Sequence, residues 1–114
     1  MEYSESLKKN QDFLRVYRKG TSAASRQFVM YVCKNGTERN RLGISVSKKV
    51  GNSVVRHRIR RLVREGYRLQ ERSFVRGCDI VIVARAAAAG CTQQEAKDML
   101  LRLGARLQVW EAEV

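Results

Sequence analysis

Residues 47–65 read Ser-Lys-Lys-Val-Gly-Asn-Ser-Val-Val-Arg-His-Arg-Ile-Arg-Arg-Leu-Val-Arg-Glu, and they contain the start of a long amphipathic helix. Apolar residues recur every three or four positions, which predicts a helix from Ser53 to about Gln70. Its apolar side comprises Val55, Ile59, Leu62, Val63, Gly66 and Leu69. A helix with one such side packs it against a core, so the opposite side faces solvent or a partner.

That opposite side is basic and comprises Arg56, His57, Arg60, Arg61, Arg64 and Arg68. Like charges four residues apart repel, and only Glu65 relieves this repulsion in the middle turns of the helix. A line of phosphates would turn the repulsion into attraction, and arginine binds phosphate oxygens through two parallel hydrogen bonds. The pattern therefore favours a nucleic-acid interface, with a merely solvated basic face as the alternative.

The overall charge points the same way. The 114-residue chain has 23 Lys and Arg against 11 Asp and Glu, a formal charge of +12. Such an excess suits a polyanionic partner, either a nucleic acid or an anionic membrane. The length predicts one domain over residues 1–114, binding RNA.

The cysteines and the apolar runs of the sequence predict the cellular compartment. The chain has three cysteines, Cys33, Cys78 and Cys91, and they form neither a CxxC motif nor a Cys/His pair. They are therefore expected to act as small apolar side chains in a reducing environment. The chain begins without a signal-peptide pattern, and its apolar runs are too short to span a bilayer. We therefore expect a cytoplasmic protein with no membrane partner.

The first half of the chain predicts a helix followed by strands. Asn10 can cap a helix that runs to about Lys19, with Gly20 in the left-handed conformation after it. Residues 21–24 suit a short edge strand. Residues 27–34 form a strand, Asn35-Gly36 a tight turn and residues 41–47 an alternating return strand, so these two strands are expected to make a hairpin.

The second half predicts a central strand and a third helix. Residues 79–84 read Asp-Ile-Val-Ile-Val-Ala, an apolar run of strand length after Asp79, as expected for a strand buried on both faces. Residues 92–95 read Thr-Gln-Gln-Glu, a capping box that opens a helix. The core side of this helix comprises Ala96, Met99, Leu100, Leu103, Leu107 and Trp110. The result is an α+β sandwich, one sheet with helices packed on it.

Three aromatic residues could form a second functional feature. Phe13 and Tyr17 share one face of the first helix, and Tyr31 lies in the middle of a strand. Such a group can stack unpaired bases, but composition alone favours ordinary core residues.

Catalytic and metal-binding residues are not apparent. The single histidine, His57, lies among arginines, and the acidic residues are scattered along the chain. Hydrolysis requires an acid, a base or metal ligands brought together. We therefore expect no catalytic residue, no metal site and no cofactor bound by the protein alone.

The residues now described resemble a known family. Residues 43–52, Gly-Ile-Ser-Val-Ser-Lys-Lys-Val-Gly-Asn, and residues 54–65, Val-Val-Arg-His-Arg-Ile-Arg-Arg-Leu-Val-Arg-Glu, look like the signature of the bacterial ribonuclease P protein subunit. The flanking segments around residues 8–17, 26–29 and 79–85 are also similar, so the resemblance extends from about Leu7 to Leu107.

The resemblance implies a fold, and it implies that catalysis and substrate binding are shared between an RNA and the protein. The fold is αβββαβα, a mixed sheet of about four strands in which the basic helix lies in a left-handed βαβ crossover. A catalytic RNA hydrolyses precursor tRNA with magnesium and releases its 5′ leader. The protein binds ribonuclease P RNA, one protein per RNA, and holds the leader of precursor tRNA, assisting tRNA 5′ maturation.

Site residues follow from the matching positions. With the basic side of the helix, the positions expected to bind the catalytic RNA are Lys48, Lys49, Asn52, Arg56, His57, Arg58, Arg60, Arg61, Arg64 and Arg68. Phe13, Tyr17 and Tyr31 match the leader-binding cleft. The family usually has asparagine where this chain has His57, and protonated histidine can only donate hydrogen bonds.

Three other readings use the same basic helix. A structural RNA binder such as a ribosomal protein would leave the aromatic group unexplained. A DNA-binding regulator would require a helix-turn-helix partner upstream, which the sequence lacks. A membrane-surface helix would need the apolar side that the core requires.

Overall fold

The computed structural model describes residues 4–109, and its helices lie where the sequence predicts them. The helices are α1 (Asn10–Lys19), α2 (Ser53–Gln70) and α3 (Gln93–Arg106), with short 3-10 helices η1 (Glu71–Ser73) and η2 (Ala86–Gly90). The strands are β1 (Ser4–Ser6), β2 (Thr21–Ala24), β3 (Phe28–Lys34), β4 (Asn40–Val46) and β5 (Cys78–Ala84). The capping box predicted for α3 is confirmed, with Thr92 and Glu95 bonded reciprocally.

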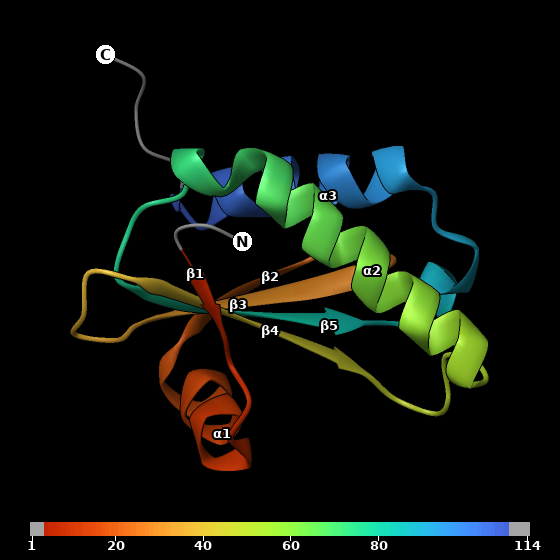
Figure 1. Cartoon of the computed structure of the whole chain (residues 1–114), viewed down its shortest axis with the longest axis horizontal. Coiled ribbons are helices and arrows are strands. Elements are labelled where there is room, and N and C mark those ends of the chain that lie inside the picture. Colours follow the sequence, from red (N-terminus) through yellow and green to blue (C-terminus); the bar gives the residue numbers. More distant parts are fainter. Residues whose placement is uncertain (1–3, 110–114) are drawn as a thin grey trace.

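The strands form one mixed sheet in the order β1-β4-β5-β3-β2. Helices α2 and α3 cover one face of this sheet, and α1 covers the other (Figure 1). The α+β prediction is confirmed, but the sheet has five strands instead of about four, because residues 4–6 pair in parallel with residues 40–42. Helix α2 connects the parallel strands β4 and β5. The left-handed sense of this crossover stays a prediction.

The predicted hairpin of β3 and β4 is wrong. Strand β5 lies between them, antiparallel to β3 and parallel to β4. A strand that is apolar over most of its length, as β5 is from Ile80 to Ala84, gains most when both edges are paired and both faces are covered, so β5 takes the central position. The Asn35-Gly36 pair therefore opens a wider loop, in which Asn35 Oδ1 accepts from the backbone N–H of Thr37 at 2.9 Å.

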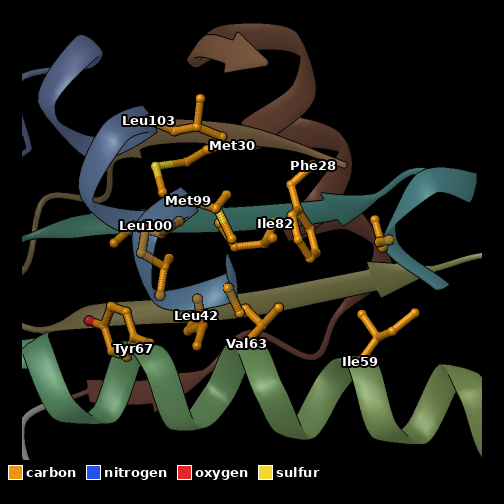
Figure 2. Close-up of a cluster of buried hydrophobic side chains, with 14 of the residues drawn as sticks. Phe28, Met30, Leu42, Ile59, Val63, Tyr67, Ile82, Met99, Leu100 and Leu103 are labelled. Carbon is orange, nitrogen blue, oxygen red and sulfur yellow. The ribbon is translucent and has the colours of Figure 1, made fainter. Parts of the chain in front are cut away.

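The main core lies between the sheet and the helices α2 and α3 (Figure 2). Its largest fully buried members include Phe28, Met30, Ile59, Ile82, Met99, Leu100 and Leu103. The prediction for Leu69 is wrong, since it is 56% exposed, and Tyr67 is buried in the core instead. The Tyr67 hydroxyl lies 2.7 Å from Ser4 Oγ, so a strand that the sequence does not predict supplies its partner. Leu107 is partly buried, and Trp110 lies outside the described residues.

The ends of α1 differ from the prediction. Asn10 is the first helical residue, and Lys9 occupies the cap position without a side-chain hydrogen bond. Gly20 is extended, with φ −81°, instead of left-handed. Glycine is needed there for space: a Cβ would lie 2.6 Å from Val16 O and 2.7 Å from Val32 O. In residues 4–109, no helix has the length and apolarity needed to cross a membrane.

We predict that Gly20→Ala lowers the free energy of unfolding by ~1–3 kcal/mol, because the added methyl group would press on two backbone carbonyls. Gly90→Ala is the matched control, since a Cβ at Gly90 meets nothing within 4 Å and its backbone needs no positive φ. Urea unfolding monitored by circular dichroism measures both. Equal stabilities of the two variants would contradict the prediction.

Candidate nucleic-acid interface

The N-terminus of α2 presents a polar and basic surface. Asn52 Oδ1 caps the helix by accepting from the backbone N–H of Val55 at 3.0 Å. Lys48 and Lys49 precede it in the exposed turn after β4. Because Ile59 and Val63 are fully buried, the rotation of α2 about its axis is determined. The basic side predicted from the sequence therefore faces away from the sheet.

Most guanidiniums on this side have no acidic partner. Within residues 4–109, no ion pair is made by Arg56, Arg60, Arg61 or Arg64. Arg61, Arg64 and His57 are exposed, and Arg60 is half-buried. The Nε of Arg56 is buried and finds no hydrogen-bond acceptor among the described residues. The positive charge of this side is therefore available to an external anion.

Arg68 is the exception on the basic side. Its guanidinium binds Glu65 through two hydrogen bonds, Nε to Oε2 at 2.9 Å and Nη2 to Oε1 at 2.5 Å. This bonding holds the pKa of Glu65 below its ordinary value. Contact of Arg68 with RNA, which stays a prediction, would compete with this exposed pair.

Arg58 is turned toward the protein. Its Nη1 donates to Cys91 O at 2.8 Å and its Nη2 to Ala89 O at 2.5 Å, so it holds the segment that leads into α3. The family resemblance assigns Arg58 to the RNA together with its neighbours, but both terminal nitrogens already have acceptors here. A structural role is therefore established for Arg58, and any RNA contact would be additional.

The aromatic residues predicted as a group do come together. The ring centroids of Tyr17 and Tyr31 are 4.9 Å apart and those of Phe13 and Tyr17 6.4 Å apart. Gly43 makes room for this packing, because a Cβ there would lie 2.6 Å from Phe13 Cζ. None of the three is fully buried, and Tyr17 is 36% exposed. The rings therefore present aromatic surface to solvent.

A surface pocket connects the aromatic residues with the basic helix. Its volume is about 380 Å³, and it is lined by Lys8, Asn10, Phe13, Tyr17, Ile44, Ser45, Val46 and Arg60. A smaller pocket of about 210 Å³ shares part of this lining and adds Ser6, Leu7, Leu42 and Arg64. Strand β1 pairs with β4 only as far as Leu42, so α1 and α2 approach the same pockets beside the uncovered part of β4. Two cationic groups, from Lys8 and Arg60, thus lie beside the rings.

Several residues that line the two pockets were not predicted from the sequence. Lys8 lies outside the basic helix, and the strand residues Ile44 and Ser45 showed only alternation. Lys8 could have been predicted from its position in the chain, because it lies shortly before Phe13. Among residues 4–109, no group of three His, Cys, Asp or Glu side chains is arranged to hold a metal ion.

Comparison with known proteins gives consistent matches. The family model "Ribonuclease P" matches residues 1–108. A ribonuclease P protein component from Lachnoclostridium phytofermentans is 59% identical over 100 residues, covering 88% of this chain and 86% of the relative. One from Exiguobacterium sibiricum is 43% identical over 115 residues, covering 100% and 99%.

Solved structures agree. The RNase P protein of Staphylococcus aureus superposes with a TM-score of 0.87 at 39% identity, covering 95% of this chain and 99% of the other. The RNase P protein of Thermotoga maritima gives a TM-score of 0.80 at 30% identity, covering 95% and 99%.

The two kinds of arginine predict opposite mutant behaviour. We expect Arg58→Met to lower the free energy of unfolding by ~1–3 kcal/mol, because two backbone carbonyls lose their donors. We expect Arg61→Met to leave stability within ~0.5 kcal/mol but to reduce the slope of log K against log salt for RNA binding by about one. Denaturation and salt-dependent binding measure the two effects. If Arg58→Met instead reduced the slope by about one without any loss of stability, Arg58 would be an RNA-binding residue and not a structural one.

Proposed function

The chain belongs to the ribonuclease P protein family, and from this premise we propose that it binds the catalytic RNA of ribonuclease P along α2 and the 5′ leader of precursor tRNA in the aromatic pocket. Family membership makes the chain a ribonuclease P protein component, whose partner is the ribonuclease P RNA. The residues proposed for this role lie on the outward side of α2 and in the pocket lined by Phe13 and Tyr17.

The observation that carries the leader proposal is the mixed lining of the larger pocket. Phe13 and Tyr17 offer ring faces, while Lys8 and Arg60 offer positive charge within the same pocket. Single-stranded nucleic acid needs this combination, since its bases stack on aromatic rings and its phosphates bind cations. Stacking tolerates any base, which suits a leader whose sequence differs between precursor tRNAs.

The catalytic RNA would take the outward side of α2 and the turn before it. Lys48, Lys49 and Asn52 lead onto this side, and Arg61 and Arg64 continue it. A folded RNA presents phosphates on its surface, and each one neutralised releases counterions. Arg60 lines the leader pocket as well, so it lies at the boundary of the two surfaces.

Within this proposal the chain binds and orients RNA. Magnesium bound by the RNA supplies the charge stabilisation for phosphodiester hydrolysis. The residues of this chain hold one strand of the substrate beside the catalytic RNA, which raises substrate affinity by simultaneous engagement of two surfaces. The stoichiometry proposed here is one protein per RNA.

Reconstitution tests the proposal. Mixed with a bacterial ribonuclease P RNA at low magnesium, the chain should give more removal of the 5′ leader than a control with the RNA alone. Gel analysis of a labelled precursor tRNA measures the product. A chain that binds the RNA tightly but restores no cleavage would instead be a structural RNA binder.

The leader pocket predicts selective loss of precursor binding. Phe13→Ala combined with Tyr31→Ala should weaken binding of precursor tRNA to the reconstituted enzyme by about 5-fold to 100-fold, as expected for the loss of base stacking worth ~1–3 kcal/mol. Mature tRNA binding should change little.

Leu14→Ala is the matched control, because Leu14 lies on the same helix and is 48% exposed. It should leave both affinities unchanged. Equal losses for precursor and mature tRNA in the aromatic variant would show that the rings serve only the packing of α1.

A further inference from the structure

Asp79 is a fully buried carboxylate near the start of the central strand β5, and Arg15 of α1 donates a hydrogen bond to it. Its Oδ1 accepts from Arg41 Nε at 2.8 Å and from Asn35 Nδ2 at 3.0 Å. Its Oδ2 accepts from Arg41 Nη2 at 2.7 Å and from Arg15 Nη2. Burial acts to raise the pKa of Asp79, but the hydrogen bonds of Arg41 and Asn35 and the two positive charges outweigh it, so the pKa lies below its ordinary value.

These contacts link α1 to two neighbouring strands in a crossed arrangement. Arg41 of β4 and Asp79 of β5 are direct partners in the parallel ladder. Helix α1 offers one charge of each sign, with Arg15 bound to Asp79 and Asp12 lying 3.4 Å from Arg41 Nη1. The four residues carry two positive and two negative charges, so the cluster is neutral as a whole.

The apolar attachment of α1 is small by comparison with the opposite face. Val16 is the one residue of α1 that is fully buried, and it packs with Leu7 and Val81. Partly buried side chains surround this group, namely Phe13, Tyr31, Cys33 and Val83. With one buried residue, against four in α2, apolar burial restrains the rotation of α1 about its axis less than it restrains that of α2. Hydrogen-bonded ion pairs are directional. Two of them, made by residues three positions apart, restrain both rotation and sliding.

The orientation of α1 determines the geometry of the pocket. Phe13 lies between Asp12 and Arg15 in the chain, and Tyr17 lies one turn further on. Since each residue turns the helix by 100°, a rotation of one residue would swing both rings away from Tyr31 and from the pocket.

We propose that Asp79 and Arg41 act, through Arg15 and Asp12, as positioning residues that hold Phe13 and Tyr17 in place for the single-stranded RNA leader. This inference rests on the proposed function of the pocket. The residues themselves need not touch RNA: Asp79 is inaccessible, and Arg15 and Arg41 are engaged with carboxylates.

The test uses the ratio of precursor tRNA affinity to mature tRNA affinity in the reconstituted enzyme, with circular dichroism confirming that each variant is folded. Arg15→Met leaves Asp79 bonded to Arg41 and Asn35, so the fold should persist. The ratio should nevertheless fall by about threefold or more, a modest coupling for neighbouring residues. In a Phe13→Ala/Tyr17→Ala background Arg15→Met should cause no further fall, because it acts through these two rings.

Asp12→Ala separates positioning from direct charge effects. Removing a negative charge near RNA would by itself strengthen binding. Positioning predicts the opposite, a fall in the ratio, because α1 loses its link to Arg41. The matched control is Arg39→Met. It removes an exposed ion pair, in which Arg39 Nε lies 3.4 Å from Glu5 Oε1, and neither residue lines the larger pocket. This variant should leave the ratio unchanged.

The outcomes are distinguishable. If Phe13→Ala does not change the ratio, the leader proposal fails and this inference fails with it. If Phe13→Ala lowers the ratio while folded Arg15→Met and Asp12→Ala do not, the leader proposal stands and the positioning role is overturned. A further fall caused by Arg15→Met in the Phe13→Ala/Tyr17→Ala background, with a higher ratio for Asp12→Ala, would mean that Arg15 contacts RNA directly, which also overturns the inference.

Discussion

Strand β5 must be covered on both faces and paired on both edges, and the arrangement of the other elements follows from this requirement. Ile80 and Ile82 are fully buried beneath α2 and α3, and Val81 is fully buried beneath α1. Pairing on both edges places β4 on one side of β5 and β3 on the other. Helix α2 therefore crosses one face of the sheet while α1 occupies the other, and both border the part of β4 that β1 leaves uncovered.

Arginines serve two different purposes in this chain. Arg15, Arg41 and Arg58 donate to groups of the protein itself and hold elements together. Arg61 and Arg64 project from α2 without an ion pair in the described residues 4–109. Unpaired guanidiniums along one helix repel one another, and a phosphate backbone relieves that repulsion. The distinction depends on which acceptors the fold brings within reach, so side-chain type alone does not reveal it.

Membership in the ribonuclease P protein family gives these surfaces a common context. The outward side of α2 suits an extended, phosphate-rich partner, whereas the pocket with Phe13 and Tyr17 suits an unpaired strand. Arg60 belongs to both, because it projects from α2 toward the pocket. The proposed function would therefore let one domain of this size contact a folded RNA and a single strand at once.

The sequence by itself determined the helices, most strand positions and the basic side of α2, because these depend on local periodicity and on capping, as at Thr92. The tertiary structure alone decided that β5 separates β3 from β4, that Ser4–Ser6 joins the sheet, and that Tyr67 replaces Leu69 in the core. It also decided that Arg58 faces inward and that Lys8 joins the aromatic pocket. Strand pairing and hydrogen-bond partners join residues far apart in the chain, so a local pattern carries no record of them.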